Sequence, residues 1–315
     1  MARTQLTACI AAHAPEPLAV VSPLVELLQV RYGANLRAVL LYGSCLHSGD
    51  LNGLFDLYAV VDSYNAAHRS RLAAWLNALL PPNVYYLETA LEGGIKLRAK
   101  YALLSLKDLQ EGVSPRWFHS YFWARFCQPT ALLWARDQDT TQKIYAAFGE
   151  AVYTLISRSL PLLPARWSTQ DLWQESLTWT YRAEFRPEQP GRQEQLFNAS
   201  VAYYRAITPL ALAELHLVAA AGVSAENQEY LSDITPFRRN LARLAWQLRI
   251  VQGKLLSVLR LMKAAYTFQG GVDYIIWKIQ RHSGVRMEAS PFLRRHPLLA
   301  LCTLSLRLYL KGGVR

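Results

Sequence analysis

A glycine-serine turn followed by a lone acidic residue is the segment best suited to chemistry. The chain runs through Gly43 and Ser44, crosses a polar loop and reaches Asp56 inside an apolar stretch. Gly43 allows a triphosphate to approach the backbone, while the Ser44 hydroxyl and nearby N–H groups can bind phosphate oxygens. An acid on the adjacent strand can hold Mg²⁺, which neutralises charge while pyrophosphate is displaced in line. The pattern favours nucleotidyl transfer, although Gly-Ser is also ordinary turn chemistry.

The acidic pattern is incomplete for an ordinary nucleotidyltransferase. A second acid two residues on would share a strand face with Asp56, but that position is Tyr58. Asp62 shares the face at a distance of roughly 20 Å along a strand, too far for one metal ion to join both. We expect Tyr58 to pack against its neighbours and Asp62 to end the strand or begin a helix.

Apolar runs and turn residues predict an α/β segment over about the first 110 residues. Strands are expected at 37–43, 54–61 and 84–87, two further elements within 95–106, and helices at 16–32 and 69–80. The remainder reads as mostly helical, and Ser168 is the expected N-cap of a helix with Asp171 in its first turn. The other expected helices are 114–125, 141–160, 195–223, 237–266 and 272–280. The secondary-structure signal is weakest at 128–138 and 187–192, where we expect the boundaries between domains.

Composition describes a globular chain with an uneven charge distribution. Of the 315 residues, 52% are hydrophobic and 18% charged, which excludes disordered and fibrous classes. No apolar run reaches the length of about 20 residues that a membrane-spanning helix needs, and we expect no secretory signal and no cysteine metal site. The net charge of the whole chain is +11, but residues 237–315 carry +13 and the first 236 residues about −2. A polyanionic partner is therefore expected for that end: a membrane surface, a nucleic acid or a phosphorylated ligand.

Several short blocks occur in the order and near-constant spacing of one enzyme family. They are Tyr42-Gly43-Ser44, Phe55-Asp56-Leu57-Tyr58 with Val61-Asp62, His68, Val84-Tyr85-Tyr86, Lys100-Tyr101-Ala102, Trp117 with Tyr121, Ala124-Arg125 and Pro129, Leu163-Pro164 with Asp171-Leu172, and Thr180 to Arg186. Together they resemble the mitochondrial-type phosphatidate cytidylyltransferases, the translocator assembly and maintenance protein family. The chain departs from that pattern where alanine replaces several glycines and where one Asn…His-Tyr-Ser segment is absent.

The resemblance implies a fold, a reaction and a domain order. The expected fold class is α/β plus α, with a nucleotidyltransferase-like domain at 1–130, an α-rich, winged-helix-like domain at 131–236 and basic C-terminal helices at 237–315. The implied reaction joins CTP to phosphatidic acid, using Mg²⁺, and yields CDP-diacylglycerol and pyrophosphate.

The same resemblance assigns roles to individual residues. Tyr42, Gly43, Ser44, Arg125 and Tyr181 are expected to bind the nucleotide. The expected catalytic residues are Asp56, Lys100 and Arg186, and the expected metal ligands are Asp56 and Glu184. Each has a plainer alternative: Lys100 can be a paired, snorkelling lysine, Arg125 can stack or anchor a helix, and Glu184 can simply pair with Arg182 or Arg186.

The C-terminal segment from Ser290 to Lys311 mixes leucines with basic residues, so it can lie in a bilayer interface or pack as an ordinary helix. We expect a peripheral membrane enzyme on the cytoplasmic or matrix face, not secreted, with phosphatidic acid and anionic lipid as partners and no nucleic acid. Two other hypotheses stay open: a nucleotidyltransferase for RNA or a soluble acceptor, and a non-catalytic descendant that binds lipid or phosphate.

Overall fold

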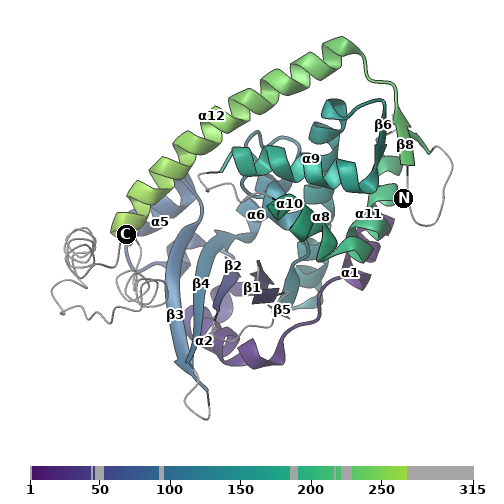
Figure 1. The fold of residues 1–315 in the computed structure, drawn as a ribbon. Coiled ribbons are helices and arrows are strands. Elements are labelled where there is room, and N and C mark those ends of the chain that lie inside the picture. The colour runs from purple at the N-terminus through teal and green to yellow at the C-terminus, as the bar shows by residue number, and fades with distance from the viewer. Residues whose placement is uncertain are drawn as a thin grey trace, which may run out of the picture.

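The computed structural model describes residues 2–43, 45–46, 53–91, 96–184, 191–215, 218–220 and 229–267. Two predicted site residues, Ser44 and Arg186, lie outside the described residues. The expected helix at 272–280 and the segment Ser290 to Lys311 lie outside them as well. The described residues form a mixed α/β structure, as the sequence predicted (Figure 1).

A five-stranded mixed sheet organises the N-terminal half. Its strands are β1 (Leu36–Tyr42), β2 (Leu54–Val61), β3 (Asn83–Ala90), β4 (Lys96–Ser105) and β5 (Ala131–Ala135), in the order β3-β4-β2-β1-β5. The β2–β4 pair is parallel, and the other neighbouring pairs are antiparallel. The three predicted strands are confirmed. The stretch 95–106 is one strand rather than two elements, and β5 lies inside the stretch that was predicted as a boundary.

Helices cover both faces of this sheet. On one face lie α2 (Ser22–Tyr32) and α5 (Arg71–Leu79), packed on Leu41 and Leu57. On the other lie α6 (Leu106–Val113), α7 (Trp123–Phe126) and α8 (Gln138–Ser159), packed on Leu40 and Tyr58. Strand alternation sends these neighbours to opposite faces, so β1 and β2 are apolar on both sides. Shorter helical turns are η1 (Ala19–Val21), η2 (Gly33–Asn35), α4 (Tyr64–Ala67) and η3 (Leu160–Leu162).

A second, mostly helical part follows β5. It contains α9 (Thr169–Arg182), α10 (Arg192–Asn198) and α11 (Val201–Ala213), together with a three-stranded sheet of β6 (Arg166–Ser168), β8 (Glu229–Ser232) and β7 (Val218–Ala220). The Ser168 prediction is confirmed: Ser168 and Asp171 form a reciprocal capping box at the start of α9. The single helix expected at 195–223 is wrong, because the chain there forms α10, α11 and then strand β7.

The helix predicted at 114–125 is also wrong over most of its length. Only α7 is helical, and residues 114–122 run as turns and bends. Guanidinium groups from distant elements bind the carbonyls of this stretch: Arg158 donates to Trp117 and Phe118, and Arg249 donates to Phe118 at 2.9 Å. In a helix, backbone N–H groups of the next turn would bind these carbonyls. Here the guanidinium groups bind them instead, so the stretch does not need to be helical.

One core joins the parts that the sequence treated as separate domains. The N-terminal helix α1 (Ala2–Ala12) packs on α8 and α11, and β5, which follows residue 130, pairs with β1. A single cluster of buried side chains includes Leu40 of the sheet, Trp173 of α9 and Trp246 of α12 (Pro236–Thr267).

The long helix α12 spans the molecule from the β6–β8 end to β3 and α5 (Figure 1), which confirms the helix predicted at 237–266. Four of its cations donate to backbone carbonyls of the body: Arg239 to Leu163, Arg249 to Phe118, Arg260 to Pro81 and Lys263 to Pro82. Burial, reinforced by Arg260, lowers the pKa of Lys263 to about 7. Among the described residues, no helix has both the length and the apolar character that crossing a bilayer requires.

Glycine at position 253 lets α12 approach the end of α9 closely. A Cβ atom there would stand 2.3 Å from the backbone oxygen of Ala183. Since no side chain fits in that space, Gly253 sets the distance between α12 and the residue that precedes Glu184.

His119 makes the stability of this fold depend on pH. It is buried beside α12, and Trp117 Nε1 donates to its Nε2 at 2.9 Å, so that nitrogen must stay unprotonated. Burial, with a smaller contribution from Arg260, lowers its pKa from 6.5 to about 3. The unfolded chain therefore binds a proton that the folded chain does not. Stability is unaffected above pH 6.5 and falls as the pH drops toward 3. We expect His119 by itself to lower the free energy of unfolding by about 2 kcal/mol between pH 7.5 and pH 5.

Urea unfolding at several pH values measures this loss. His119→Asn keeps a hydrogen-bond acceptor and should flatten the pH dependence, whereas His13→Asn, at an exposed histidine, should leave the slope as in the parent protein. An equal slope in the parent and His119→Asn proteins would contradict the assignment.

Candidate functional site

Three predicted site residues lie side by side across the centre of the sheet. Strand register pairs Tyr42 of β1 with Asp56 of β2, and Asp56 with Lys100 of β4. Directly paired residues on neighbouring strands project from the same face. The Lys100 ammonium lies 2.8 Å from Asp56 Oδ1, with both side chains partly exposed. The plainer expectation for Lys100, a paired lysine, is thus met by the same carboxylate that was predicted to be catalytic.

The turn after β1 packs directly on that carboxylate. Gly43 has φ +88°, a left-handed conformation that side chains rarely adopt, and its ideal Cβ position lies 3.0 Å from Asp56 Oδ2. The structure therefore brings Gly43 and Asp56 together, as the sequence hypothesis required. The phosphate-binding role of Ser44 stays a prediction, since that residue lies outside the described residues.

Arg125 of α7 reaches the same sheet face and organises a buried polar cluster. Its Nη1 donates to the Tyr58 hydroxyl at 3.1 Å, its Nη2 lies 3.5 Å from Glu184 Oε2, and only 12% of its side chain is exposed. Its guanidinium also lies over the rings of Tyr42, at 5.7 Å, and Tyr121, at 4.2 Å. Glu184, just after α9, thus has Arg125 as a partner, a pairing that the sequence alternatives did not include.

The charges in this cluster perturb one another. Burial by itself lowers the pKa of Arg125, but Tyr121, Tyr58 and Glu184 outweigh it and raise the pKa above the ordinary value. Burial raises the pKa of Tyr58 despite Arg125. Burial by itself would raise the pKa of Tyr121, but the charges of Arg125 and Arg260 outweigh burial and lower that pKa. Arg125 therefore stays charged, and Tyr58 is a neutral hydrogen-bond partner of Arg125 as well as a packed side chain.

Arg260 is a site residue that the sequence did not reveal. Its guanidinium lies 3.9 Å from the centre of the Tyr121 ring, so Tyr121 contacts both Arg125 and Arg260. Arg260 belongs to α12, 135 positions beyond Arg125 in the sequence. The available signal was the high positive charge of residues 237–315, but charge alone does not show which cation returns to the sheet.

The acidic residues fit one metal-binding carboxylate better than two. Asp56 Oδ1 is buried, with Lys100 as its compensating charge, and Oδ2 faces Gly43, which has no side chain. Mg²⁺ commonly uses one or two carboxylates and takes its remaining ligands from water and substrate phosphates. The described residues contain no group of three potential metal ligands, and Glu184 is paired with Arg125. Asp56 thus fits a Mg²⁺ ligand whose partners come from a bound triphosphate.

Asp62 directly follows β2 and forms ion pairs with Arg37 at 2.7 Å and with Arg136 at 2.9 Å. This agrees with its expected place at the end of the strand. Tyr181 lies in the last turn of α9, where it adds to the effect of burial in raising the pKa of Tyr204.

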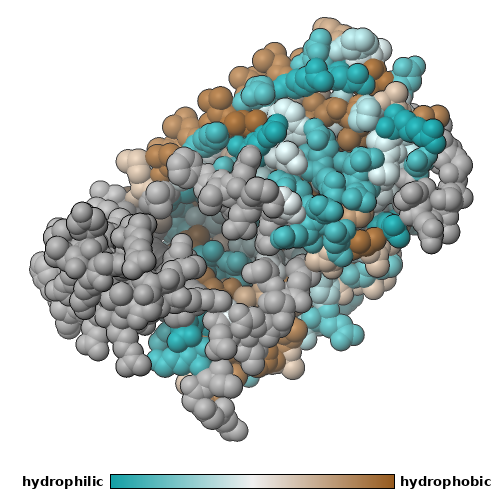
Figure 2. All heavy atoms as spheres, in the orientation of Figure 1, coloured by the Kyte–Doolittle hydropathy of each residue, from teal (hydrophilic) through white to brown (hydrophobic). Residues whose placement is uncertain are grey.

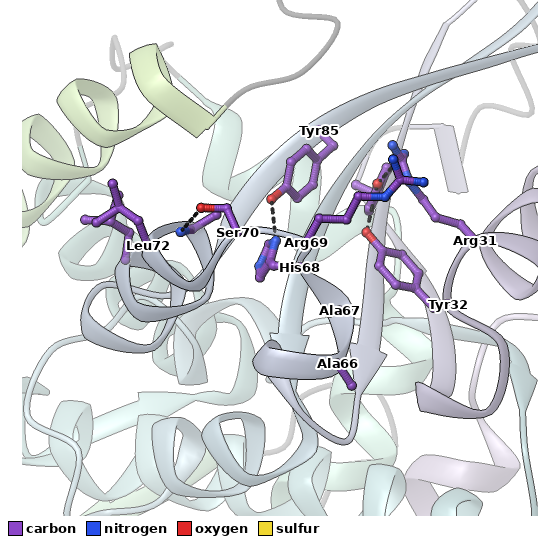
Figure 3. A pocket seen from close by; sticks show the side chains of 12 residues that line it. Arg31, Tyr32, Ala66, Ala67, His68, Arg69, Ser70, Leu72 and Tyr85 are labelled. Atoms are coloured by element: carbon purple, nitrogen blue, oxygen red, sulfur yellow. Dashed lines mark hydrogen bonds between the residues drawn. The ribbon is translucent and has the colours of Figure 1, made fainter.

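A polar cavity of about 710 Å³ lies on the opposite face of the sheet, and Figure 3 shows its lining. Of the predicted site residues that the structure describes, none lines it. Its polar groups bind one another: His68 contacts Asn77 at 3.2 Å and Tyr85 at 3.4 Å, and Tyr101 accepts from Arg31. His68 is thus a half-buried histidine with hydrogen-bond partners, and this cavity is separate from Asp56.

Comparison with protein-family models and with curated protein sequences gave no match.

Removing Arg125 should destabilise the fold. Arg125→Gln leaves Glu184 and the Tyr58 hydroxyl without their buried cation, and we expect the free energy of unfolding to fall by about 3 kcal/mol. Arg136→Gln is the matched control, because Arg136 makes its ion pairs at the surface and should cost about 1 kcal/mol or less. Chemical denaturation measures both. Equal losses in the two variants would show that the Arg125 cluster is not a structural anchor.

Proposed function

We propose that this chain is a cytidylyltransferase that joins CTP to phosphatidic acid, releasing CDP-diacylglycerol and pyrophosphate. The observation that carries the proposal is the convergence of the Gly43 turn, Asp56 and Lys100 on one sheet face. A carboxylate, an ammonium group and a glycine in the turn are the parts that a triphosphate site needs: a metal ligand, a cation for phosphate oxygens and room for the backbone to approach.

Each residue of the site has a role in this reaction. The Gly43 turn gives the triphosphate access to backbone N–H groups. Lys100 can move from Asp56 to a phosphate oxygen when Asp56 binds a metal, because an ammonium on a flexible stem reorients easily. Arg125 and Arg260 keep this face positive and hold Tyr121 between them. Mg²⁺, when bound at Asp56, would neutralise charge on the phosphates as pyrophosphate leaves.

No strong general base is required on the chain. The attacking group is an oxygen of the phosphatidate phosphate, which is already ionised at neutral pH, so the site has to align two anions rather than remove a proton. The bond that forms joins this oxygen to the α-phosphorus of CTP, and the bond that breaks releases pyrophosphate. Following the sequence resemblance, Arg186 is proposed as a further catalytic residue and Tyr181 as a further nucleotide-binding residue.

The fold assignment belongs to the same proposal. A sheet with α2 and α5 on one face and Asp56 on the other is compatible with a nucleotidyltransferase domain, and β6-β8-β7 with α9 and α11 with a winged-helix-like domain. For the lipid acceptor, we propose peripheral binding to anionic membrane through Ser290 to Lys311, whose leucines and cations suit a bilayer interface.

Asp56→Asn should lower the rate of CDP-diacylglycerol formation about 100-fold or more, because the amide is a poor Mg²⁺ ligand and no longer balances Lys100. The assay uses radiolabelled CTP with vesicles of phosphatidylcholine and phosphatidic acid, with ATP, GTP and UTP in parallel. Asp62→Asn is the matched control: it removes a carboxylate from the same strand, outside the proposed site, and should retain activity within a few-fold. Absence of product from the parent protein with any of the nucleotides would refute the enzymatic proposal.

CTP with Mg²⁺ should raise the melting temperature of the parent protein, and Mg²⁺ or CTP alone should raise it less. Ligand present at 100 times its Kd adds about 2.7 kcal/mol of stability. This assay separates the proposed enzyme from a non-catalytic descendant. The second hypothesis stays open because Tyr58 stands where a second acid is expected. A non-catalytic phosphate binder would show stabilisation that does not depend on Mg²⁺ or on Asp56.

A further inference from the structure

The outward face of α12 carries an uninterrupted apolar seam. Large apolar side chains recur along it at alternating spacings of four and three residues, the a and d positions of a heptad repeat. The seam consists of Phe237, Leu241, Leu244, Leu248, Val251, Leu255, Val258 and Met262. Each of these side chains is between 43% and 76% exposed, and Figure 2 shows hydrophobic residues gathered along the edge of the molecule that α12 forms.

The face of α12 that packs on the body contains most of its charge. Arg239, Arg249, Arg260 and Lys263 donate to body carbonyls, and Trp246 is buried between them. Helix positions beside the seam are mostly neutral: Asn240, Ala245, Gln247, Gln252 and Leu259, with Arg238 and Lys254 as the cations. The outward face is therefore apolar with weakly charged margins.

This arrangement suits another helix better than a lipid surface. A helix on an anionic bilayer places its cations beside the apolar face, at the level of the headgroups, whereas α12 turns most of its cations toward its own body. A strict 3.5-residue repeat also drifts by about 20° per heptad around a straight helix, and a supercoiled partner helix follows that drift. α12 has 32 residues, enough for the three to four heptads that mark a coiled coil.

We propose that α12 pairs with α12 of a second copy of this chain in an antiparallel coiled coil. In the antiparallel register each a residue shares a layer with a d residue of the partner: Leu241 with Val258, Leu248 with Val251, Leu255 with Leu244, and Met262 with Phe237. Every seam residue then has an apolar partner. The flanking cations meet neutral residues, Arg238 facing Leu259 and Lys254 facing Gln247, so no like charges oppose each other.

The mass of the full chain in solution tests this pairing. The parent protein at tens of micromolar should show twice 35.7 kDa by light scattering. Leu244→Lys/Leu248→Lys should show a single copy with an unchanged circular dichroism spectrum at 25 °C, because both side chains are exposed and the body does not need them to fold. Val30→Lys changes an apolar side chain that is 86% exposed on α2 and should stay dimeric. A monomeric parent protein, or a seam variant that remains dimeric, would overturn the proposal.

Cysteine cross-linking tests the orientation. Leu241→Cys/Val258→Cys should form dimers under mild oxidation, whereas Leu241→Cys alone should not, because those two positions coincide only in a parallel pair. Cross-linking of the single variant at the level of the double variant would overturn the antiparallel register.

Flotation with vesicles of phosphatidylcholine and phosphatidic acid tests whether the seam binds a bilayer instead of a second α12. If the seam variant loses vesicle binding and the parent protein is monomeric, the seam faces lipid and the proposal fails. If both proteins float equally and the parent is dimeric, the proposal holds. The pairing depends on α12 alone, so its failure would leave the cytidylyltransferase proposal untouched, and the reverse is also true.

Discussion

The charge balance between Asp56 and Lys100 constrains the rest of the site. A carboxylate near the end of a central strand, in a sheet that packs apolar side chains on both faces, needs a partner, and the parallel pairing of β2 with β4 supplies Lys100 at 2.8 Å. That pairing fixes which side chains share the face, and it leaves the Gly43 turn free to close over the second carboxylate oxygen. A polar site can therefore exist at the sheet surface without leaving a buried charge uncompensated.

Long-range packing of α12 completes the site from a different part of the chain. Its cations bind carbonyls at Leu163, Phe118, Pro81 and Pro82, so the helix joins the sheet part to the helical part. The same contacts bring Arg260 to Tyr121 and leave the apolar seam outside. One helix thus contributes to the polar cluster with one face and presents the seam to solvent with the other.

Local signals in the sequence predicted much of the fold. The strands at β1, β2 and β3, the capping box at Ser168 and the helix at 237–266 follow from apolar periodicity and short-range hydrogen bonds, which depend on neighbouring residues. The predictions failed where distant groups decide the backbone. Arg158 and Arg249 bind the carbonyls of residues 114–122 in place of a helix, and β5 becomes a strand because β1 offers it an edge.

The sequence by itself determined that Gly43 and Asp56 lie at the ends of neighbouring strands, since a strand, a turn and a strand follow directly along the chain. It could not determine how each charge would be balanced. Tertiary structure alone decided that Lys100 faces Asp56, that Glu184 pairs with Arg125 and that Arg260 returns to Tyr121. These contacts join residues dozens of positions apart, and side-chain charge can select a partner only after the backbone has brought it within a few ångströms.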